Sequence, residues 1–543
     1  MKIVRIPSSK NGHFLGWILI LLLIILVAYI LISDPSSTSI QSTWNTLQHQ
    51  FNTKNVTELP TLTIDMDFEM YNQILAQRQE ALDSGVFIGG DADFVPADIT
   101  LNGETVRVRM RLQQGPATHL FPDDKWNFEI RTDEDQPLLN MTRAQLVDPA
   151  DNNWLHEWAF QQTLIEAGIL ATPITFVELM LNGDNRGIYA LQTGFDANLP
   201  TSQGKEPGII VEFDPTLIWQ NIAYFDGDSK AALADPVTNL SDSGIQFLEV
   251  DTFRDAAIAR DDNLSSQKEE AIEKLRAFQR GELTAAELFD LDAYAQFLAL
   301  SDLWGASDAT SLLNLRFFYN AETGLLEPIG FNGNPQLENG RVDMAAATFN
   351  DPDLQTATIQ ALQAVTDPAY LADLEASLAN DWETWQRTLS AEANITPPWS
   401  SLAQQQANIQ RSLQPQQPIF ANFIAAENTP TGVLQLEIGS VVNLPVEIIG
   451  LDFGNDTYLE AQSDWVINGT ENVRETMPNL IVLEPFADNM ALVRLEIPLT
   501  DIYGVNPNDV TLNANDILIE SRIWGTTGST KTAVRPSFAT NNQ

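Results

Sequence analysis

Nineteen consecutive uncharged residues, from Phe14 to Ile32 (FLGWILILLLIILVAYILI), constrain this chain more than any other feature. At about 1.5 Å per residue, a helix of this length nearly matches the roughly 30 Å hydrocarbon thickness of a bilayer. The run is longer than the apolar region of a signal peptide, and no good small-x-small cleavage site follows it. Basic residues precede it, and the first charge after it is Asp34. The positive-inside rule therefore predicts a single-pass anchor over 14–33, with residues 1–13 cytoplasmic and the bulk of the chain extracytoplasmic.

The composition predicts a folded, acidic body. A chain of 543 residues has room for two to four domains, and its 44% hydrophobic residues can build a core despite a net charge of -44. With 73 acidic and 29 basic residues, the chain is a poor candidate for binding nucleic acid, because phosphate recognition depends on clustered Lys and Arg. The lack of cysteine excludes disulfides and thiolate metal sites, and four scattered histidines argue against a His-based zinc site.

Beyond the apolar run, the sequence divides into three parts. Residues 34–58 are rich in Ser, Thr, Asn and Gln without a sustained apolar period, which is typical of a stalk. Residues 59–428 carry strand signals first and helical signals later, so they predict an α+β domain. Residues 429–543 alternate in short apolar runs with no long helix, which predicts an all-β, sandwich-like domain. We interpret this last part as a spacer or adhesion module.

Local signals within the α+β part predict particular elements. Asn-Gly pairs at 102–103 and 182–183 predict tight hairpins, since both residues tolerate positive φ. The segment PAYLADLEASLANDWETWQRTL at 368–389 has the apolar spacing of a helix. A D-F-G tripeptide at 452–454 lies in the all-β part, far from any partner motif, and we attribute it to chance. The motifs of serine hydrolases, zincins and P-loop proteins are absent.

Four segments carry the functional signal, and together they resemble the CotH family of atypical protein-kinase-like proteins. The segment 94–131 contains two hairpin strands and then a Lys-Trp strand, and 176–195 is similar to the family's N-G hairpin. In 299–334 an Asp precedes an Asn, and a hairpin ends in F-N-G-N. The segment 395–413 looks like the closing helix of the family. The resemblance covers about 59–428, and the order of its segments is more specific than any one motif.

The resemblance implies a kinase-like α+β fold that binds ATP with Mg²⁺ or Mn²⁺ and phosphorylates serine on secreted or surface proteins. Such transfer needs cations against the phosphates, metal ligands and an acceptor for the substrate proton. The implied cations are Arg109, Arg111 and Lys125, for which the alternative is an ordinary exposed strand charge. Either Asp302 or Asp308 is the implied base, although Asp302 could instead cap a helix. Asn314 is the implied metal ligand.

The sequence departs from the family pattern at positions that should carry charge. Gln192 stands where the family pattern has Glu, Asn332 where it has a metal-binding Asp, and Gln113 where it has a corner Lys. Each change keeps the shape and loses the charge, and Mg²⁺ on a triphosphate prefers anionic oxygens. We therefore expect Gln192 at the nucleotide and Asn332 at the metal, with reduced or absent phosphotransfer. The alternatives are a non-catalytic scaffold or surface-assembly module and, on the all-β part alone, a carbohydrate-binding envelope protein.

Overall fold

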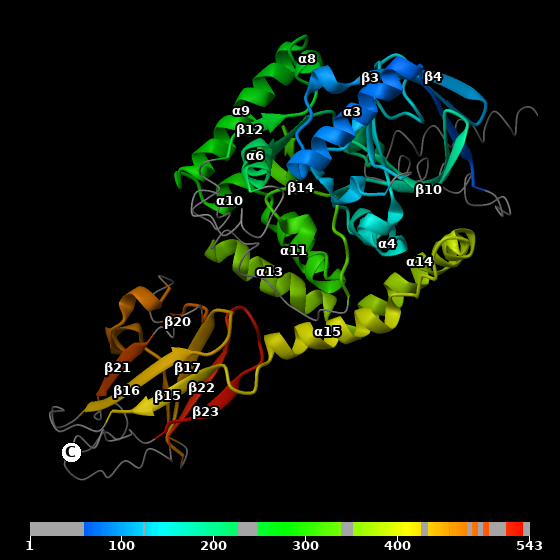
Figure 1. The fold of residues 1–543 in the computed structure, drawn as a ribbon. Coiled ribbons are helices and arrows are strands. Elements are labelled where there is room, and N and C mark those ends of the chain that lie inside the picture. Colours follow the sequence, from blue (N-terminus) through cyan, green and yellow to red (C-terminus); the bar gives the residue numbers. More distant parts are fainter. Residues whose placement is uncertain are drawn as a thin grey trace, which may run out of the picture.

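The computed structural model describes residues 59–122, 125–225, 248–337, 351–424, 433–454, 457–474, 480–486, 492–498 and 517–535. Figure 1 shows the N-terminal strands and the helices gathered in one body, with the C-terminal strands beside it next to α13 and α15. The order of the elements along the chain is strands first, then mixed strands and helices, then strands again.

A closed barrel of seven strands forms the N-terminal part of this body, in the order β1-β3-β4-β6-β7-β10-β9. Alternate side chains such as Val108, Met110 and Leu112 fill its interior, as the period of two in a strand requires. Helix α3 (Phe68–Ser84) contributes Ile74 to the same core. The strands are β1 (Thr61–Asp65), β3 (Val95–Leu101), β4 (Glu104–Leu112), β6 (Phe128–Thr132), β7 (Arg143–Val147), β9 (Ile174–Leu181) and β10 (Asp184–Thr193).

The two predicted Asn-Gly hairpins join barrel strands. Asn102 and Gly103 have φ of 54° and 84° between β3 and β4, and Asn182 and Gly183 have φ of 49° and 85° between β9 and β10. Positive φ at both central residues matches the twist of the flanking strands, which is why this turn favours Asn-Gly. The turn chemistry of the sequence therefore predicted both connections correctly.

A second, five-stranded sheet follows, in the order β12-β11-β13-β14-β8. One face, with Ile210, Phe318 and Ile329, forms a small apolar cluster. The other face, with Val211 and Phe317, belongs to the large core shared with the helices. The strands are β8 (Leu170–Ala171), β11 (Ile209–Phe213), β12 (Val250–Thr252), β13 (Arg316–Asn320) and β14 (Leu325–Gly330), and the short strands β2 (Val86–Phe87) and β5 (Gly115–Pro116) pair beside the barrel.

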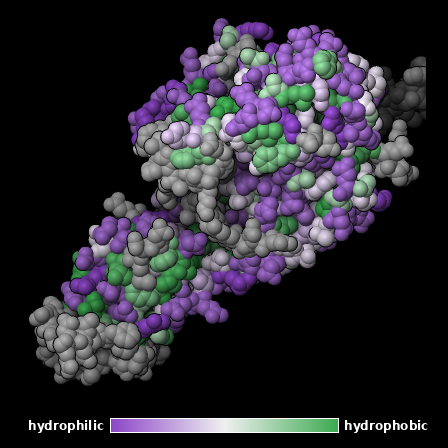
Figure 2. Space-filling view, in the orientation of Figure 1, coloured by the Kyte–Doolittle hydropathy of each residue, from purple (hydrophilic) through white to green (hydrophobic). Residues whose placement is uncertain are grey.

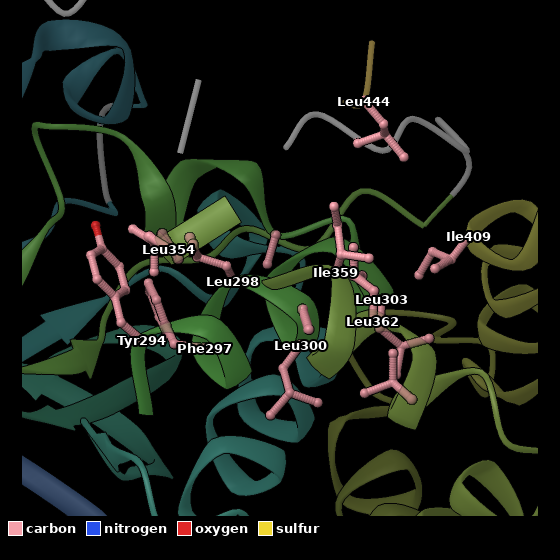
Figure 3. Packing of buried hydrophobic residues seen from close by; sticks show 14 of the residues in the cluster. Tyr294, Phe297, Leu298, Leu300, Leu303, Leu354, Ile359, Leu362, Ile409 and Leu444 are labelled. Carbon is pink, nitrogen blue, oxygen red and sulfur yellow. The ribbon is translucent and has the colours of Figure 1, made fainter. Parts of the chain in front are cut away.

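Helix α11 (Leu291–Trp304) runs through the centre of the large core. Asp290 caps its first turn by accepting from the backbone N–H of Ala293, and Gly305, at φ +61°, ends it. Figure 3 shows Phe297 and Leu298 of α11 lying with Leu354 of α13. Besides α3 and α11, the described α-helices are α4 (Leu155–Glu166), α5 (Asn198–Ser202), α6 (Thr216–Tyr224), α8 (Asp255–Ile258), α9 (Asp262–Gln279), α10 (Ala285–Leu288), α13 (Pro352–Val365), α14 (Pro368–Leu389) and α15 (Trp399–Leu413).

Two antiparallel sheets form the C-terminal part, in the orders β15-β16-β21-β19 and β18-β17-β22-β23. They contact α13, because Arg474 donates to Gln355 (2.6 Å) and Trp524 Nε1 donates to Thr356 (2.7 Å). The strands are β15 (Ile419–Phe423), β16 (Val433–Ser440), β17 (Val446–Asp452), β18 (Tyr458–Glu460), β19 (Val466–Asn468), β20 (Ile481–Leu483), β21 (Val493–Pro498), β22 (Leu518–Ile523) and β23 (Thr530–Ala533). The first sheet thus includes β15, which precedes the boundary expected at 429.

This architecture corrects the predicted fold class. We expected a kinase-like α+β domain with a membrane helix before it and an all-β domain after it. The described residues instead form a mixed α/β arrangement with a closed barrel and several further sheets. The barrel closes because β1 pairs with β3 on one side and, in parallel, with β9 on the other, so no open edge is left. No turn signal in the sequence marks that parallel pairing.

The membrane assignment is also corrected. None of the helices that the structure describes is long and apolar enough to cross a bilayer. Helix α14, with 22 residues, is long enough but carries Asp, Glu and Arg along its length. The expected anchor over 14–33, with the flanking segments 1–13 and 34–58, lies outside the described residues. The single-pass topology and the extracytoplasmic location are therefore withdrawn.

Candidate functional site

The residues implied for base and metal binding meet where α11 and β14 end. Asp308 lies on the short 3₁₀ helix Ser307–Thr310 that follows α11, and Asn314 lies just before β13. The loop 331–337 follows β14 and returns to the end of α11, where the N–H of Gln336 donates to the carbonyl of Gly305 (3.0 Å). Three segments distant in sequence thus converge.

Amide groups dominate the resulting cluster. Asn314 Nδ2 donates to the backbone carbonyl of Asp308 (2.9 Å), and Asn332 Nδ2 donates to Asn314 Oδ1 (3.4 Å). Asn334 Nδ2 donates to the Asp308 carboxylate (3.2 Å). Asn332 and Asn334 have φ of +51° and +45°, a left-handed conformation in which asparagine is enriched. Asn334 was missed by the sequence reasoning, although its place in F-N-G-N was a usable signal.

Glu157, which the sequence reasoning also missed, holds the loop 331–337 in place from the side of the protein core. It lies on α4, fully inside the protein, and accepts from the backbone N–H groups of Gly333 (3.1 Å) and Asn334 (2.7 Å) and from Gln161 Nε2 (2.7 Å). Burial raises the pKa of Glu157, and these hydrogen bonds oppose that shift. No local motif marks Glu157, because its partners lie 176 and 177 positions further along the chain.

Asp308 is the carboxylate of the cluster that stays accessible to solvent. Partial desolvation raises its pKa above the ordinary value, and the hydrogen bond from Asn334 opposes that rise. Asp302 lies in the last turn of α11, and its backbone carbonyl accepts from Gln405 Nε2 (3.0 Å). Asn334 contacts Asp308, so of the two candidate bases Asp308 is the one that belongs to the amide cluster.

Gln192 is connected to the loop 331–337 by hydrogen bonds that pass through Thr172. Buried on β10, it donates to Thr172 Oγ1 (2.7 Å), and that hydroxyl donates to the carbonyl of Gly330 (3.2 Å) just before the loop. The N–H of Thr172 donates to Gln161 Oε1 (3.3 Å), and Gln161 in turn contacts Glu157. A buried chain of hydrogen bonds therefore links the barrel to the loop, and Gln192 has a structural role within it.

Of the three implied phosphate cations, Arg109 and Arg111 lie on β4 and Lys125 lies shortly before β6, and all three already donate to protein oxygens. Arg109 donates to the carbonyl of Asp91 (3.2 Å), and the buried Arg111 forms an ion pair with Glu129 (2.9 Å). Lys125 forms ion pairs of 3.1 Å with Asp148 and 3.0 Å with Glu392. Gln113, at the corner where the family has Lys, donates to Gln145 (3.4 Å). The ion pairs of Arg111 and Lys125 thus neutralise two of the three positive charges implied for a triphosphate site.

The cluster does not fit a catalytic magnesium or manganese ion. Within the described ranges, no group of three or more His, Cys, Asp or Glu side chains could hold a metal. Asp308 is accessible, but Glu157 is engaged by two backbone N–H groups, and the remaining side chains are neutral amides. Hard divalent cations in nucleotide sites prefer carboxylate oxygens. No metal-dependent step can therefore be built from these residues.

Comparison with known proteins adds little to this geometry. No family model matches the chain, and no curated protein matches it. Among solved structures, one match is to the alkylpurine DNA glycosylase AlkC of Pseudomonas fluorescens bound to DNA containing an abasic site analog. The sequences are 13% identical, the match covers 62% of this chain and 86% of the other, and the TM-score is 0.10. At that score the likeness supports no argument about fold or function.

Proposed function

We propose that this chain is a CotH-like protein that has lost phosphoryl transfer and acts as a non-catalytic scaffold for other proteins. The observation that carries the proposal is the amide cluster, in which Asn334 donates to the accessible carboxylate of Asp308, Asn314 donates to the Asp308 backbone carbonyl, and Asn332 donates to Asn314. These side chains form a polar site that lacks the carboxylate ligands which metal-dependent phosphoryl transfer requires.

Charge repulsion explains why asparagine is more stable than aspartate at positions 332 and 334. Aspartates at 332 and 334 would stand close to Asp308 and the buried Glu157, so four carboxylates would meet where the donors described above are backbone N–H groups and neutral amides. Like charges at such separations disfavour ionisation and cost stability unless a metal ion compensates. Neutral amides remove that repulsion and leave a loop that is stable without a cation.

The barrel supports the same conclusion. Arg111 would have to leave a buried ion pair with Glu129 in order to reach a phosphate, and the uncompensated Glu129 would then be costly. Lys125 would have to leave two carboxylates. Triphosphate binding here therefore competes with interactions that already stabilise the fold.

The surface chemistry indicates which partners such a scaffold would hold. Figure 2 shows a largely hydrophilic face over the barrel and helices, and the chain carries a net charge of -44. A surface of this sign attracts basic partners and repels nucleic acid. We therefore propose basic segments of partner proteins as its ligands.

Thermal unfolding of the full chain with ATP, with and without Mg²⁺ or Mn²⁺, tests the proposal, because a ligand that binds only the native state raises the midpoint. We expect no metal-dependent shift in the wild type. The variants N332D and N332D/N334D, which add carboxylates to the amide cluster, should gain one. N468D, which makes the same change on β19, is the control. A metal-dependent shift or serine phosphorylation by the wild type would overturn the loss of transfer.

A further inference from the structure

Glu392, in the connection between α14 and α15, reaches across to the barrel and places its carboxylate in a formed anion site. Its Oε2 lies 3.0 Å from Lys125 Nζ, and its Oε1 accepts from the backbone N–H of Ile188 (2.7 Å). The two contacts join residues 267 and 204 positions apart in the chain. One carboxylate thus receives both a charged donor and a neutral donor from the barrel.

The backbone of β10 is shaped for this carboxylate. The ladder between β9 and β10 shifts register at Asn185 and Gly187, and Gly187 has φ of +81°. A Cβ at Gly187 would lie 2.6 Å from Glu392 Oε1, so a side chain here would displace the carboxylate, and the positive φ itself favours glycine. Bulges of this kind re-aim a backbone group, and here the N–H of Ile188 points out of the ladder.

The cation of the site is held in place by groups other than Glu392. Lys125 Nζ lies 5.7 Å from the ring centre of Trp154 and 5.6 Å from that of Tyr189, and Asp148 Oδ1 lies 3.1 Å from it. Aromatic faces favour a cation over them, and an ammonium has three N–H donors. Asp148 uses one donor to orient Lys125, which leaves donors for a second anion.

We propose that Lys125, the N–H of Ile188 and the space above Gly187 form an anion-binding site that Glu392 occupies from within the chain. An external phosphate or carboxylate group enters only when Glu392 leaves. The tethered carboxylate acts as a competitor at an effective concentration of at least millimolar order, so weak external anions do not displace it. The site is therefore autoinhibited by its own chain.

This site lies beside the amide cluster. Trp154 follows Asn153, whose Nδ2 donates to the carbonyl of Pro335 (2.6 Å) in the loop 331–337. The inference deepens the proposed function, because it concerns the regulation of a cation that the CotH resemblance assigns to phosphates. It does not depend on any metal or nucleotide.

The test measures thermal unfolding of the full chain in pyrophosphate or glutarate, against sodium chloride of equal ionic strength. In the variant E392A we expect a rise of about 1 to 2 °C in the midpoint, with none in the wild type. E375A, which removes an exposed carboxylate from α14, should behave as the wild type. The double variant E392A/K125M should lose the response. A larger response to pyrophosphate assigns a phosphate ligand, and a larger response to glutarate assigns a carboxylate.

The variant E392Q keeps the test decisive if E392A does not fold. Its amide oxygen can still accept from Ile188, while the charge opposite Lys125 is gone, so pyrophosphate should stabilise it more than the wild type. Equal responses of the wild type and both Glu392 variants would overturn the inference. Because no metal or ATP is used, this result is separate from the outcome of the N332D experiments.

Discussion

Two neighbouring regions of this protein handle buried polarity in opposite ways. On the second sheet, the guanidinium of Arg316 on β13 and the carboxyl group of Glu212 on β11 lie 2.6 Å apart inside the protein. In the loop 331–337, which follows the adjacent strand β14, the side chains at 332 and 334 are amides. The difference indicates that this protein has a buried carboxylate only where the fold supplies hydrogen-bond donors or a cation for it. Glu157 obeys the same rule, with two backbone N–H groups and one amide as its donors.

The Arg316–Glu212 pair should give the largest effect when it is broken. Arg316 also lies 5.8 Å from the Phe331 ring centre and donates to the carbonyls of Leu313 and Leu315, so it connects the sheet to the candidate site. Replacing it by methionine leaves Glu212 buried without its partner, which costs about 4 kcal/mol. Chemical denaturation of R316M against wild type measures this loss.

A matched control is R522M, because Arg522 forms a 2.6 Å pair with Glu447 that is about one-third exposed on the arginine side. Its loss should be several-fold smaller, since solvent screens the pair. If R316M and R522M lose the same free energy of unfolding, burial does not make the Arg316–Glu212 pair more important than an exposed pair. The contrast between this buried pair and the amide loop would then be wrong.

Removing the acceptor beneath the amide loop should give the next largest effect. The variant E157A leaves the N–H groups of Gly333 and Asn334 without their acceptor and opens a space under the loop, which costs about 3 kcal/mol. E157Q keeps an oxygen for one N–H, so it should lose less. Denaturant unfolding of the two variants checks the order. A smaller loss in E157A than in E157Q would show that Glu157 strains the loop.

The smallest of these effects is a pH dependence. Burial raises the pKa of Glu212 to about 7, Arg316 opposes that rise, and Asp251, Asp214 and Glu129 add to it. Between its ordinary value of 4.5 and about 7, the folded chain holds a proton that the unfolded chain releases. This contribution to stability is therefore present at low pH and is lost as pH rises through about 7.

The measurement is the free energy of unfolding from pH 4 to pH 8 for wild type and E212Q. The slope due to Glu212 should vanish in E212Q, whatever its absolute stability, and it should persist in the control E447Q. An unchanged slope in E212Q would assign the pH dependence to other acidic groups.

The sequence by itself determined those features that depend on neighbours in the chain. The two Asn-Gly pairs give hairpins because both residues accept positive φ, and the apolar spacing over 368–389 gives α14 over the same residues. The amides at 192 and 332, where the CotH resemblance implies carboxylates, were also visible in the sequence. They led us to expect a weakened site, and that expectation remains the basis of the proposal.

Only the tertiary structure decided what depends on distant partners. It closed the barrel through the parallel pairing of β1 with β9, put Glu157 under the loop 331–337, and brought Glu392 to Lys125. Turn chemistry and periodicity act over a few residues, whereas these contacts join residues up to 267 positions apart. The free energy of such a contact depends on burial and on the donors that converge in the folded state, so no local pattern in the sequence encodes it.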